Sequence, residues 1–127
     1  RKLSEPDLKK YRLYADWLQQ MENKYSIMSF RQDLAGLGEP KEGSWDGYQR
    51  INTDTKAGGI MAVFRHGAIE TKRMVTVNYL LPDKMYQVKK IDGSVVVILS
   101  GADLQTKGFE VAINKLYDGE IFEISGE

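Results

Sequence analysis

The stretch MYQVKKIDGSVVVILS, residues 85–100, places two apolar segments on either side of the dipeptide Asp92-Gly93. Asp-Gly readily adopts the positive φ angles that a two-residue hairpin turn requires. The stretch therefore predicts two antiparallel strands, Met85–Lys90 and Ser94–Ser100. From Trp45 onward, similar segments rich in valine, isoleucine, phenylalanine and tyrosine recur roughly every ten residues, a spacing typical of an antiparallel β-sandwich or barrel.

The sequence as a whole predicts a mainly β fold. We expect an antiparallel Greek-key β-sandwich of about seven to eight strands, preceded by one amphipathic amino-terminal α-helix. Turn signals such as Pro82-Asp83 and Asp118-Gly119 separate the strands, because proline presets φ for a turn and Asp-Gly suits a hairpin. The expected strands are Asp46–Asn52, Gly59–His66, Lys72–Leu80, Met85–Lys90, Ser94–Ser100, Phe109–Asn114 and Glu120–Ile124.

The helix is expected over Glu5–Tyr25. Ser4 suits the N-cap, and Pro6 is tolerated in the first turn because its missing N–H would have no helical partner there. The end of the helix is poorly marked, since no glycine follows until Gly36. Apolar residues recur at steps of three and four and predict one buried face: Leu8, Tyr11, Ala15, Leu18, Met21 and Tyr25.

The domain organisation follows from these elements. Residues 1–44 form the helix and a connector rich in glycine, with a short extended piece at Ile27–Phe30, and residues 45–127 form the sandwich domain. Two expected strands are apolar on both faces, at Ile60–Phe64 and Val95–Leu99. A strand with one face in water does not need this, so we expect the helix, or a partner domain, to cover them.

Composition limits the function. The 127 residues carry 18 basic and 18 acidic side chains, so the formal net charge is zero, which favours neither nucleic acid nor an anionic membrane as a partner. The absence of cysteine excludes disulfides, thiol nucleophiles and cysteine zinc sites,. It leaves the cellular compartment open. The sequence starts at Arg1, and we interpret it as a fragment or a processed form.

No residue pattern predicts a catalytic site, a cofactor or a metal site. His66 is the single histidine and has no second histidine or cysteine with which to bind zinc. Asp33, Asp46 and Asp54 could supply the two carboxyls that glycoside hydrolysis needs. We interpret them instead as residues of turns and strand starts, where aspartate is common for structural reasons.

Aromatic side chains are the candidate binding residues. Exposed tryptophan and tyrosine rings can stack on the apolar face of a sugar, and the hypothesis of a carbohydrate-contact site names Trp45 and Tyr48. Trp45 is the better candidate for exposure because it directly follows the turn residues Gly43 and Ser44. The alternative is that it fills the gap between helix and sandwich.

Several segments resemble the carboxy-terminal region of retaining glycoside hydrolases of families 36 and 27, the α-galactosidase (melibiase) group. They are WDGYQRIN (45–52), GGIMAVFR (58–65), LPDKMYQV (81–88), SGADL (100–104), KGFEV (107–111) and IFEI (121–124). In this group a (β/α)8 catalytic barrel precedes an all-β sandwich, and the resemblance implies that our amino-terminal helix is the last helix of such a barrel. The family's two catalytic aspartates lie upstream in the barrel and have no counterpart here.

The resemblance implies a non-catalytic accessory domain that packs against and stabilises the barrel of the same polypeptide. Two alternatives remain. One is a carbohydrate-binding module that uses exposed aromatic residues, and the other is an unrelated immunoglobulin-like interaction domain.

Overall fold

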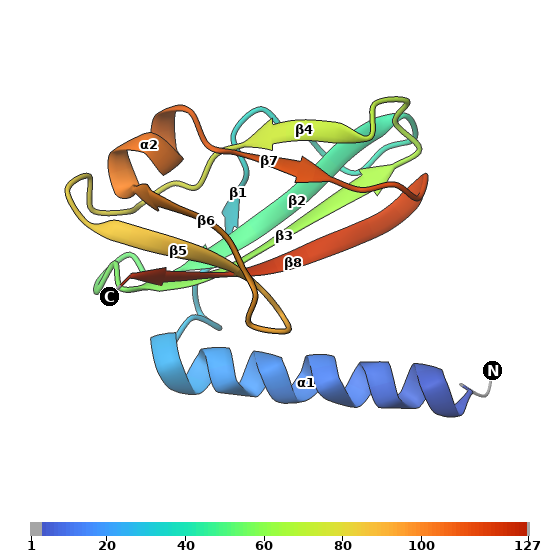
Figure 1. Ribbon diagram of the computed structural model, residues 1–127, viewed down its shortest axis with the longest axis horizontal. Helices are drawn as coiled ribbons and strands as arrows, with labels where there is room; N and C mark the ends of the chain where they lie inside the picture. Colours follow the sequence, from blue (N-terminus) through green and yellow to red (C-terminus); the bar gives the residue numbers. More distant parts are fainter. Residues whose placement is uncertain (1–3, 127) are drawn as a thin grey trace.

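The computed structural model describes residues 4–126. Six strands form one antiparallel sheet in the order β1-β2-β3-β8-β5-β6, and β4 pairs with β7 as a separate ribbon. Figure 1 shows α1 below the sheet, with the β4–β7 ribbon and α2 above it. The predicted fold class, mainly β with antiparallel sheets after an amino-terminal helix, is confirmed. The elements are α1 (Glu5–Tyr25), β1 (Gln32–Asp33), β2 (Ser44–Ile51), β3 (Gly58–His66), β4 (Lys72–Val75), β5 (Met85–Lys90), β6 (Val95–Ser100), α2 (Gly101–Thr106), β7 (Phe109–Ala112) and β8 (Tyr117–Gly126).

Helix α1 has the predicted bounds. The side chain of Ser4 accepts a hydrogen bond from the backbone N–H of Asp7 at 3.3 Å, which satisfies one free donor of the first turn,. At the other end, Ser26 takes the left-handed conformation in place of a glycine, and its N–H donates to the Glu22 carbonyl. The buried face differs from the predicted one, because Trp17 lies on it together with Met21 and Tyr25. Tyr11 and Ala15, which the periodicity assigns to this face, are exposed.

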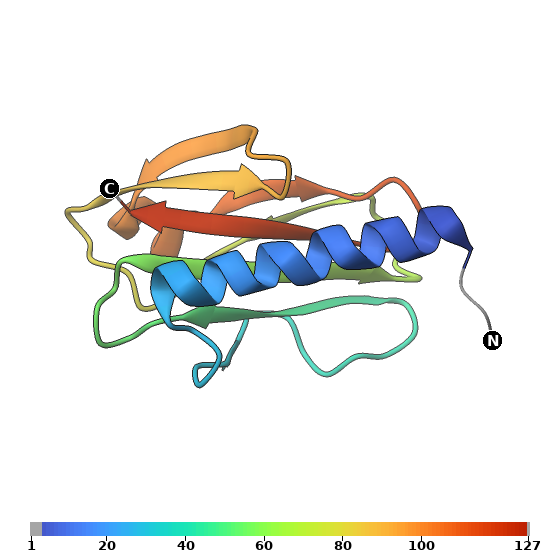
Figure 2. The same cartoon turned by 90° about the horizontal axis from the view of Figure 1, so that it is seen from below.

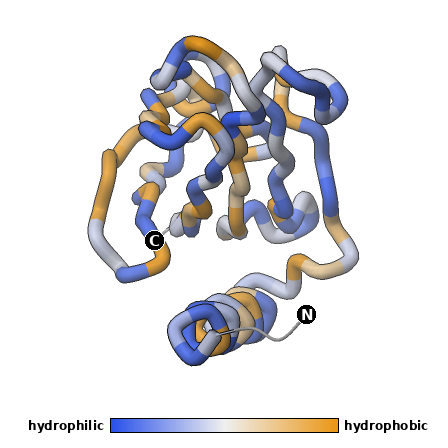
Figure 3. Tube along the Cα trace, turned by 90° about the vertical axis from the view of Figure 1, so that its right-hand side faces the viewer, coloured by the Kyte–Doolittle hydropathy of each residue, from blue (hydrophilic) through white to orange (hydrophobic). Residues whose placement is uncertain are grey.

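Strand β3 is covered on both faces, which explains its unbroken apolar sequence. On one face, Ile60 packs against Trp17, Met21, Tyr25 and Ile27 beneath α1. The other face, with Met61 and Val63, joins the main core. Figures 2 and 3 show α1 as a separate layer that runs along the sheet. The expectation that the helix covers this strand is confirmed.

Strand β6 is not covered in the same way. Val97 and Leu99 pack against the main core, whereas Val96 and Ile98 are exposed. Successive side chains of a strand point to opposite faces, so the outer face of β6 presents an apolar surface to solvent. The helix therefore accounts for one of the two doubly apolar segments only.

The segment after β4 is not a strand as predicted, since β4 ends at Val75. The fully buried side chain of Gln49 takes the place of a strand partner: it accepts from the N–H of Asn78 and donates to the carbonyl of the same residue, both at 3.0 Å. The N–H of Val77 donates to the carbonyl of Leu104. These contacts satisfy the backbone without a β-ladder.

Two connecting segments also differ from prediction. Ile27–Phe30 is a turn, not an extended piece, because the N–H of Phe30 donates to the carbonyl of Ile27. The connection 101–108 contains helix α2, whose N-cap Ser100 accepts from the N–H of Asp103 at 3.0 Å. Leu104, fully buried, anchors this helix in the main core.

The connector contributes to the sheet and to its core. Strand β1 pairs with β2, and Leu34 and Leu37 lie in the main core. The proposed domain boundary at Trp45 stays a prediction. Neither helix in residues 4–126 combines the length and the apolar character that crossing a bilayer requires.

Candidate binding site

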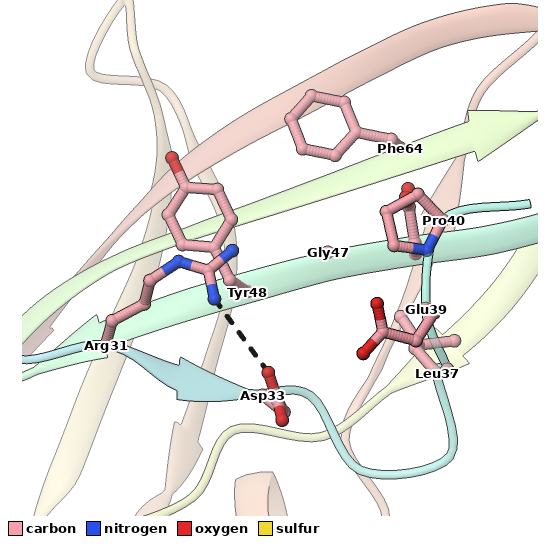
Figure 4. Close-up of a pocket in the computed structure, with 10 residues that line it drawn as sticks. Arg31, Asp33, Leu37, Glu39, Pro40, Gly47, Tyr48 and Phe64 are labelled. Atoms are coloured by element: carbon pink, nitrogen blue, oxygen red, sulfur yellow. Dashed lines mark ion pairs between the residues drawn. The ribbon is translucent and has the colours of Figure 1, made fainter.

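A pocket of about 410 Å³ lies where the 31–40 segment meets the helix-side face of β2 and β3. Figure 4 shows Arg31 and Tyr48 on one side of it and Glu39 and Pro40 on the other, with Phe64 above. Three parts of the chain thus supply its walls: β1 with the residues around it, β2 and β3. The lining residues are Arg31, Asp33, Leu37, Gly38, Glu39, Pro40, Asp46, Gly47, Tyr48 and Phe64.

The alternation of β2 places Asp46 and Tyr48 on the pocket side. Asp46 pairs with Phe64, and Tyr48 pairs with Ala62, in the register of β2 and β3. Gly47 lies between them and allows close packing, because a Cβ there would lie 2.3 Å from the carbonyl oxygen of Ala62 and 2.8 Å from Leu34. This contact brings the 31–40 segment close to the strand.

Asp46 is the unusual polar residue of the pocket. Its side chain is buried, with 7% of the residue exposed, and its Oδ1 has no hydrogen-bond partner among residues 4–126. Leaving a buried polar group without a partner costs about 1–3 kcal/mol, and more when the group is charged. Asp46 therefore destabilises the free domain unless a water molecule or a ligand satisfies it.

Tyr48 is held by two guanidinium groups. The Cζ atom of Arg31 lies 4.6 Å from the ring centroid of Tyr48, and that of Arg50 lies 5.7 Å from it. Arg50 has a structural role, since its Nη1 donates to the carbonyls of Met28 and Phe30 at 3.1 and 2.8 Å. Nη1 of Arg31 lies 3.9 Å from Oδ1 of Asp33, and both side chains are largely exposed. Their ion pair therefore contributes little to the stability of the fold.

Helix α1 reaches this region through Tyr14. Burial, followed by the neighbouring Tyr48, raises the pKa of the Tyr14 hydroxyl. The phenol of Tyr14 therefore remains a neutral hydrogen-bonding group at physiological pH. The pocket therefore lies next to the helix as well as to the connector.

A second hollow of about 440 Å³ continues the pocket along β3 and β8. The two share Pro40, Asp46 and Phe64, and the second adds His66 and Tyr117. The rings of His66 and Tyr117 pack edge to face, with their centroids 5.7 Å apart. The hydroxyl of Tyr117 donates a hydrogen bond to Oε2 of Glu42. Together the two hollows form one groove around Asp46.

The two predicted carbohydrate-contact residues point in opposite directions. Tyr48 lines the pocket. The expectation that Trp45 is exposed is wrong: it is 2% exposed, lies in the main core and donates its indole N–H to the carbonyl of Glu70 at 3.2 Å. Odd and even positions of a strand face opposite sides, so Trp45 and Tyr48 cannot form one stacking surface. Trp45 has a packing role, but it lies in the main core and not in the layer between the helix and the sheet that the sequence left as its alternative.

The other candidates are also placed. Asp33 and Asp46 both line the pocket, whereas Asp54 lies in the exposed turn after β2. His66 lies at the end of β3 in the second hollow, and the described part of the chain has no group of three His, Cys, Asp or Glu residues that could hold a metal ion.

Sequence reasoning missed Phe64 and Arg31 as pocket residues. The alternation within β2 could indicate that Asp46 and Tyr48 share a face, but their pairing with β3 depends on the register between the strands. The site offers carboxylate acceptors, a guanidinium donor and two aromatic rings around one hollow.

Comparison with solved structures relates the fold to that of a galactosidase domain. No family model matches the sequence, and no curated protein matches it. Among solved structures, the galactosidase domain of an α-galactosidase–sucrose kinase, AgaSK, superposes with a TM-score of 0.65 over 98% of this chain at 18% sequence identity. The chain spans 17% of the length of that protein. The chain thus has the fold of part of a galactosidase domain.

Proposed function

We propose that this chain is the non-catalytic carboxy-terminal accessory domain of an α-galactosidase-like glycoside hydrolase, similar to those of families 36 and 27. In this role it packs against a (β/α)8 barrel of the same polypeptide and stabilises it. The observation that carries the proposal is the superposition of nearly the whole chain on a part of the AgaSK galactosidase domain. At 18% sequence identity the superposition shows a shared fold only. The α-galactosidase-like activity of the parent protein is therefore part of the proposal.

The amino-terminal half of α1 supports the docking role. Trp17, Met21 and Tyr25 are buried against the sheet, but the exposed fractions of Tyr11 and Leu13 are 66% and 62%. Figures 1 and 2 show that this end of α1 extends beyond the strands. Because residues two positions apart lie on different sides of a helix, the two side chains do not form a single patch, and we assign to the barrel a contact that surrounds this exposed end of α1.

The test compares the isolated chain with the full polypeptide that contains it. In the double variant Tyr11→Ser/Leu13→Ser, we expect an unchanged Tm for the isolated chain, because both side chains are exposed there. In the full polypeptide the same variant should lower the Tm by several degrees, since the two residues lose a buried apolar environment. The matched control is Tyr79→Ser/Leu81→Ser, which replaces two exposed apolar residues outside α1.

Two outcomes contradict the proposal. One is an equal effect of the α1 variant in both contexts. The other is hydrolysis of an aryl α-galactoside by the purified isolated chain that Asp46→Asn abolishes, because this would place a catalytic residue inside the domain.

A carbohydrate-binding role is the second candidate. Trp45 is buried and therefore drops out of this candidate. Tyr48 lines a pocket with Asp46, whose Oδ1 has no hydrogen-bond partner within residues 4–126. The groove, rather than a flat aromatic platform, is the feature that favours this candidate.

A further inference from the structure

We propose that strand β6 is a self-association surface, on which two copies of this chain pair through antiparallel β6 strands about a two-fold axis at Ile98. The inference goes beyond the docking role of α1 and does not depend on it, because α1 and β6 are different surfaces of the molecule. Figure 2 shows the β5–β6 hairpin at the rim of the sheet, beside the strands that α1 covers.

The outer edge of β6 carries backbone groups without a strand partner. β6 ends the six-stranded sheet, and among the described strands it pairs with β5 alone. The N–H of Gly101 donates to the carbonyl of Lys84 in the same ladder, and the backbone groups of successive residues point in alternate directions,. The N–H and carbonyl of Val97 and Leu99 therefore point to β5, and those of Ile98 point away from the sheet. Such an edge is a template for another strand.

The two edges of the sheet differ in how they are protected. Natural sheets limit unwanted pairing with short edge strands, charged residues or proline. At one edge, β1 is two residues long and includes the exposed Asp33. At the other edge, β6 has the sequence VVVILS, without a charge or a proline. Its exposed large side chains are all apolar, namely Val95, Val96 and Ile98.

The register of β6 is self-complementary about Ile98. Residues 97–100 pair with β5 without interruption, because the register shift in this hairpin lies nearer the turn. A two-fold axis at Ile98 would place this residue opposite its counterpart, so that each N–H donates to the other carbonyl. Val97 would then lie opposite Leu99 of the second copy, and both of these side chains already pack against the main core.

This match of one patch with itself is the reason to assign the partner as a second copy, because a two-fold contact uses the same surface on both subunits. The paired segments are only about 17 Å long. A contact of this length buries less surface than the roughly 1,200–2,000 Å² of a stable complex. The dimer should therefore be reversible and form at high protein concentration.

Sedimentation velocity of the 127-residue chain over a concentration series tests the association. We expect a monomer–dimer equilibrium with a Kd of about 0.1 mM. Ile98→Lys should raise this Kd about tenfold or more, because two like charges would meet at the axis. The matched control is Met74→Lys on β4, since the exposed fractions of Met74 and Ile98 are 55% and 51%. Both variants should keep the Tm of the unmodified chain in dilute solution.

Cysteine cross-linking tests the register. The chain contains no cysteine, so Ile98→Cys introduces a single thiol at the proposed axis. Opposite residues of a hydrogen-bonded antiparallel pair have Cα atoms about 5.5 Å apart, which a disulfide can span. Under mild oxidation, Ile98→Cys should form a disulfide-linked dimer about tenfold faster than the control Met74→Cys, because pairing raises the effective concentration of the thiols.

Four results would overturn the proposal. They are a chain that stays monomeric far above the expected Kd, self-association that Ile98→Lys leaves unchanged, association that continues beyond the dimer, and cross-linking of Ile98→Cys that is no faster than that of Met74→Cys. None of them affects the docking test on Tyr11 and Leu13, which compares Tm values.

Discussion

The hydroxyl of Tyr25, the last residue of α1, donates a hydrogen bond to Oε2 of Glu123 on β8, a residue 98 positions further along the chain. The Nζ atom of Lys24 lies 2.8 Å from the same oxygen. Burial, followed by the bond to Glu123, raises the pKa of Tyr25 to about 12. Burial also acts to raise the pKa of the Glu123 carboxyl, but the hydrogen bonds from Lys24 and Tyr25 together outweigh it and lower that pKa. The carboxylate form of Glu123 therefore helps to hold the helix on the sheet.

The first prediction concerns acid stability. Because the pKa of Glu123 is lower in the folded chain than its unfolded value of about 4.3,, its contribution is complete above the unfolded pKa and disappears as the pH falls through the folded pKa. The free energy of unfolding of Glu123→Gln should lie below that of the unmodified chain at neutral pH, and the difference should shrink in acid.

Urea unfolding monitored at several pH values measures this difference. Glu110→Gln is the control, because Glu110 is exposed on β7, and its difference should stay near zero. A gap for Glu123→Gln that is constant from neutral pH to strong acid would show that the carboxylate does not stabilise the helix contact.

The second prediction concerns the layer between α1 and the sheet. Trp17 is buried there with Met21, Tyr25 and Ile60, so Trp17→Ala should lower the free energy of unfolding by about 3–5 kcal/mol. Tyr11→Ala, on the exposed part of the same helix, should change it by less than about 0.5 kcal/mol. Denaturant unfolding of both variants measures these free energies. Equal decreases for the two variants would mean that the packing of the helix on the sheet does not depend on this layer.

The third prediction concerns the buried Arg65. Its guanidinium donates to the carbonyls of Ala68, Ile69, Ile113 and Asn114 at 2.8–3.1 Å, which ties the ends of β3 and β7 to the loops beside them. Lysine cannot reproduce this fan of donors. We expect Arg65→Lys to cost about 2–4 kcal/mol, because several buried carbonyls lose their partners.

The exposed Arg12→Lys on α1 serves as the matched control and should be neutral,. Amide hydrogen exchange adds a local readout: protection near Ile113 should fall in Arg65→Lys and stay unchanged in Arg12→Lys. Unaltered protection would contradict the role assigned to Arg65.

The fourth prediction concerns the close approach of β2 and β3. A Cβ at Gly59 would lie 1.9 Å from the carbonyl oxygen of Arg50, whereas a Cβ at Gly38 would meet nothing within 4 Å. Gly59→Ala must displace a backbone and should lower the Tm by many degrees, while Gly38→Ala should leave it unchanged or slightly higher. Thermal unfolding of the pair provides the comparison, and similar Tm values for the two variants would contradict the register described for β2 and β3.

Local sequence features predicted the parts of the fold that depend on neighbouring residues. The cap at Ser4 and the periodicity predicted the bounds of α1, and Asp92-Gly93 predicted the β5–β6 hairpin, in which Gly93 adopts a φ of 90°. Predictions failed where a distant group replaced the local one. Gln49 binds Asn78 where the expected strand would continue past Val75. Ser100 caps α2 within a segment for which the sequence predicts a connection only.

The sequence predicts only some residues of the candidate site. The sequence indicates Tyr48 as a binding residue, favours a structural role for Asp33 and Asp46, and gives no signal for Phe64 as a site residue. Trp45 follows turn residues and so has the sequence context of an exposed ring, yet it faces the core. Whether Trp45 or Asp46 faced the helix side could not be read from β2 alone, because both faces of this strand are partly buried.

The sequence by itself determined the helix, most strands and the antiparallel hairpins, because capping, turn conformation and apolar periodicity act between residues close in the chain. Only the tertiary structure decided which face of β2 meets the helix, which residues enclose the groove and why Oδ1 of Asp46 has no hydrogen-bond partner in the described part of the chain. These features depend on strand order and register, which join residues far apart in the chain through packing and long-range hydrogen bonds.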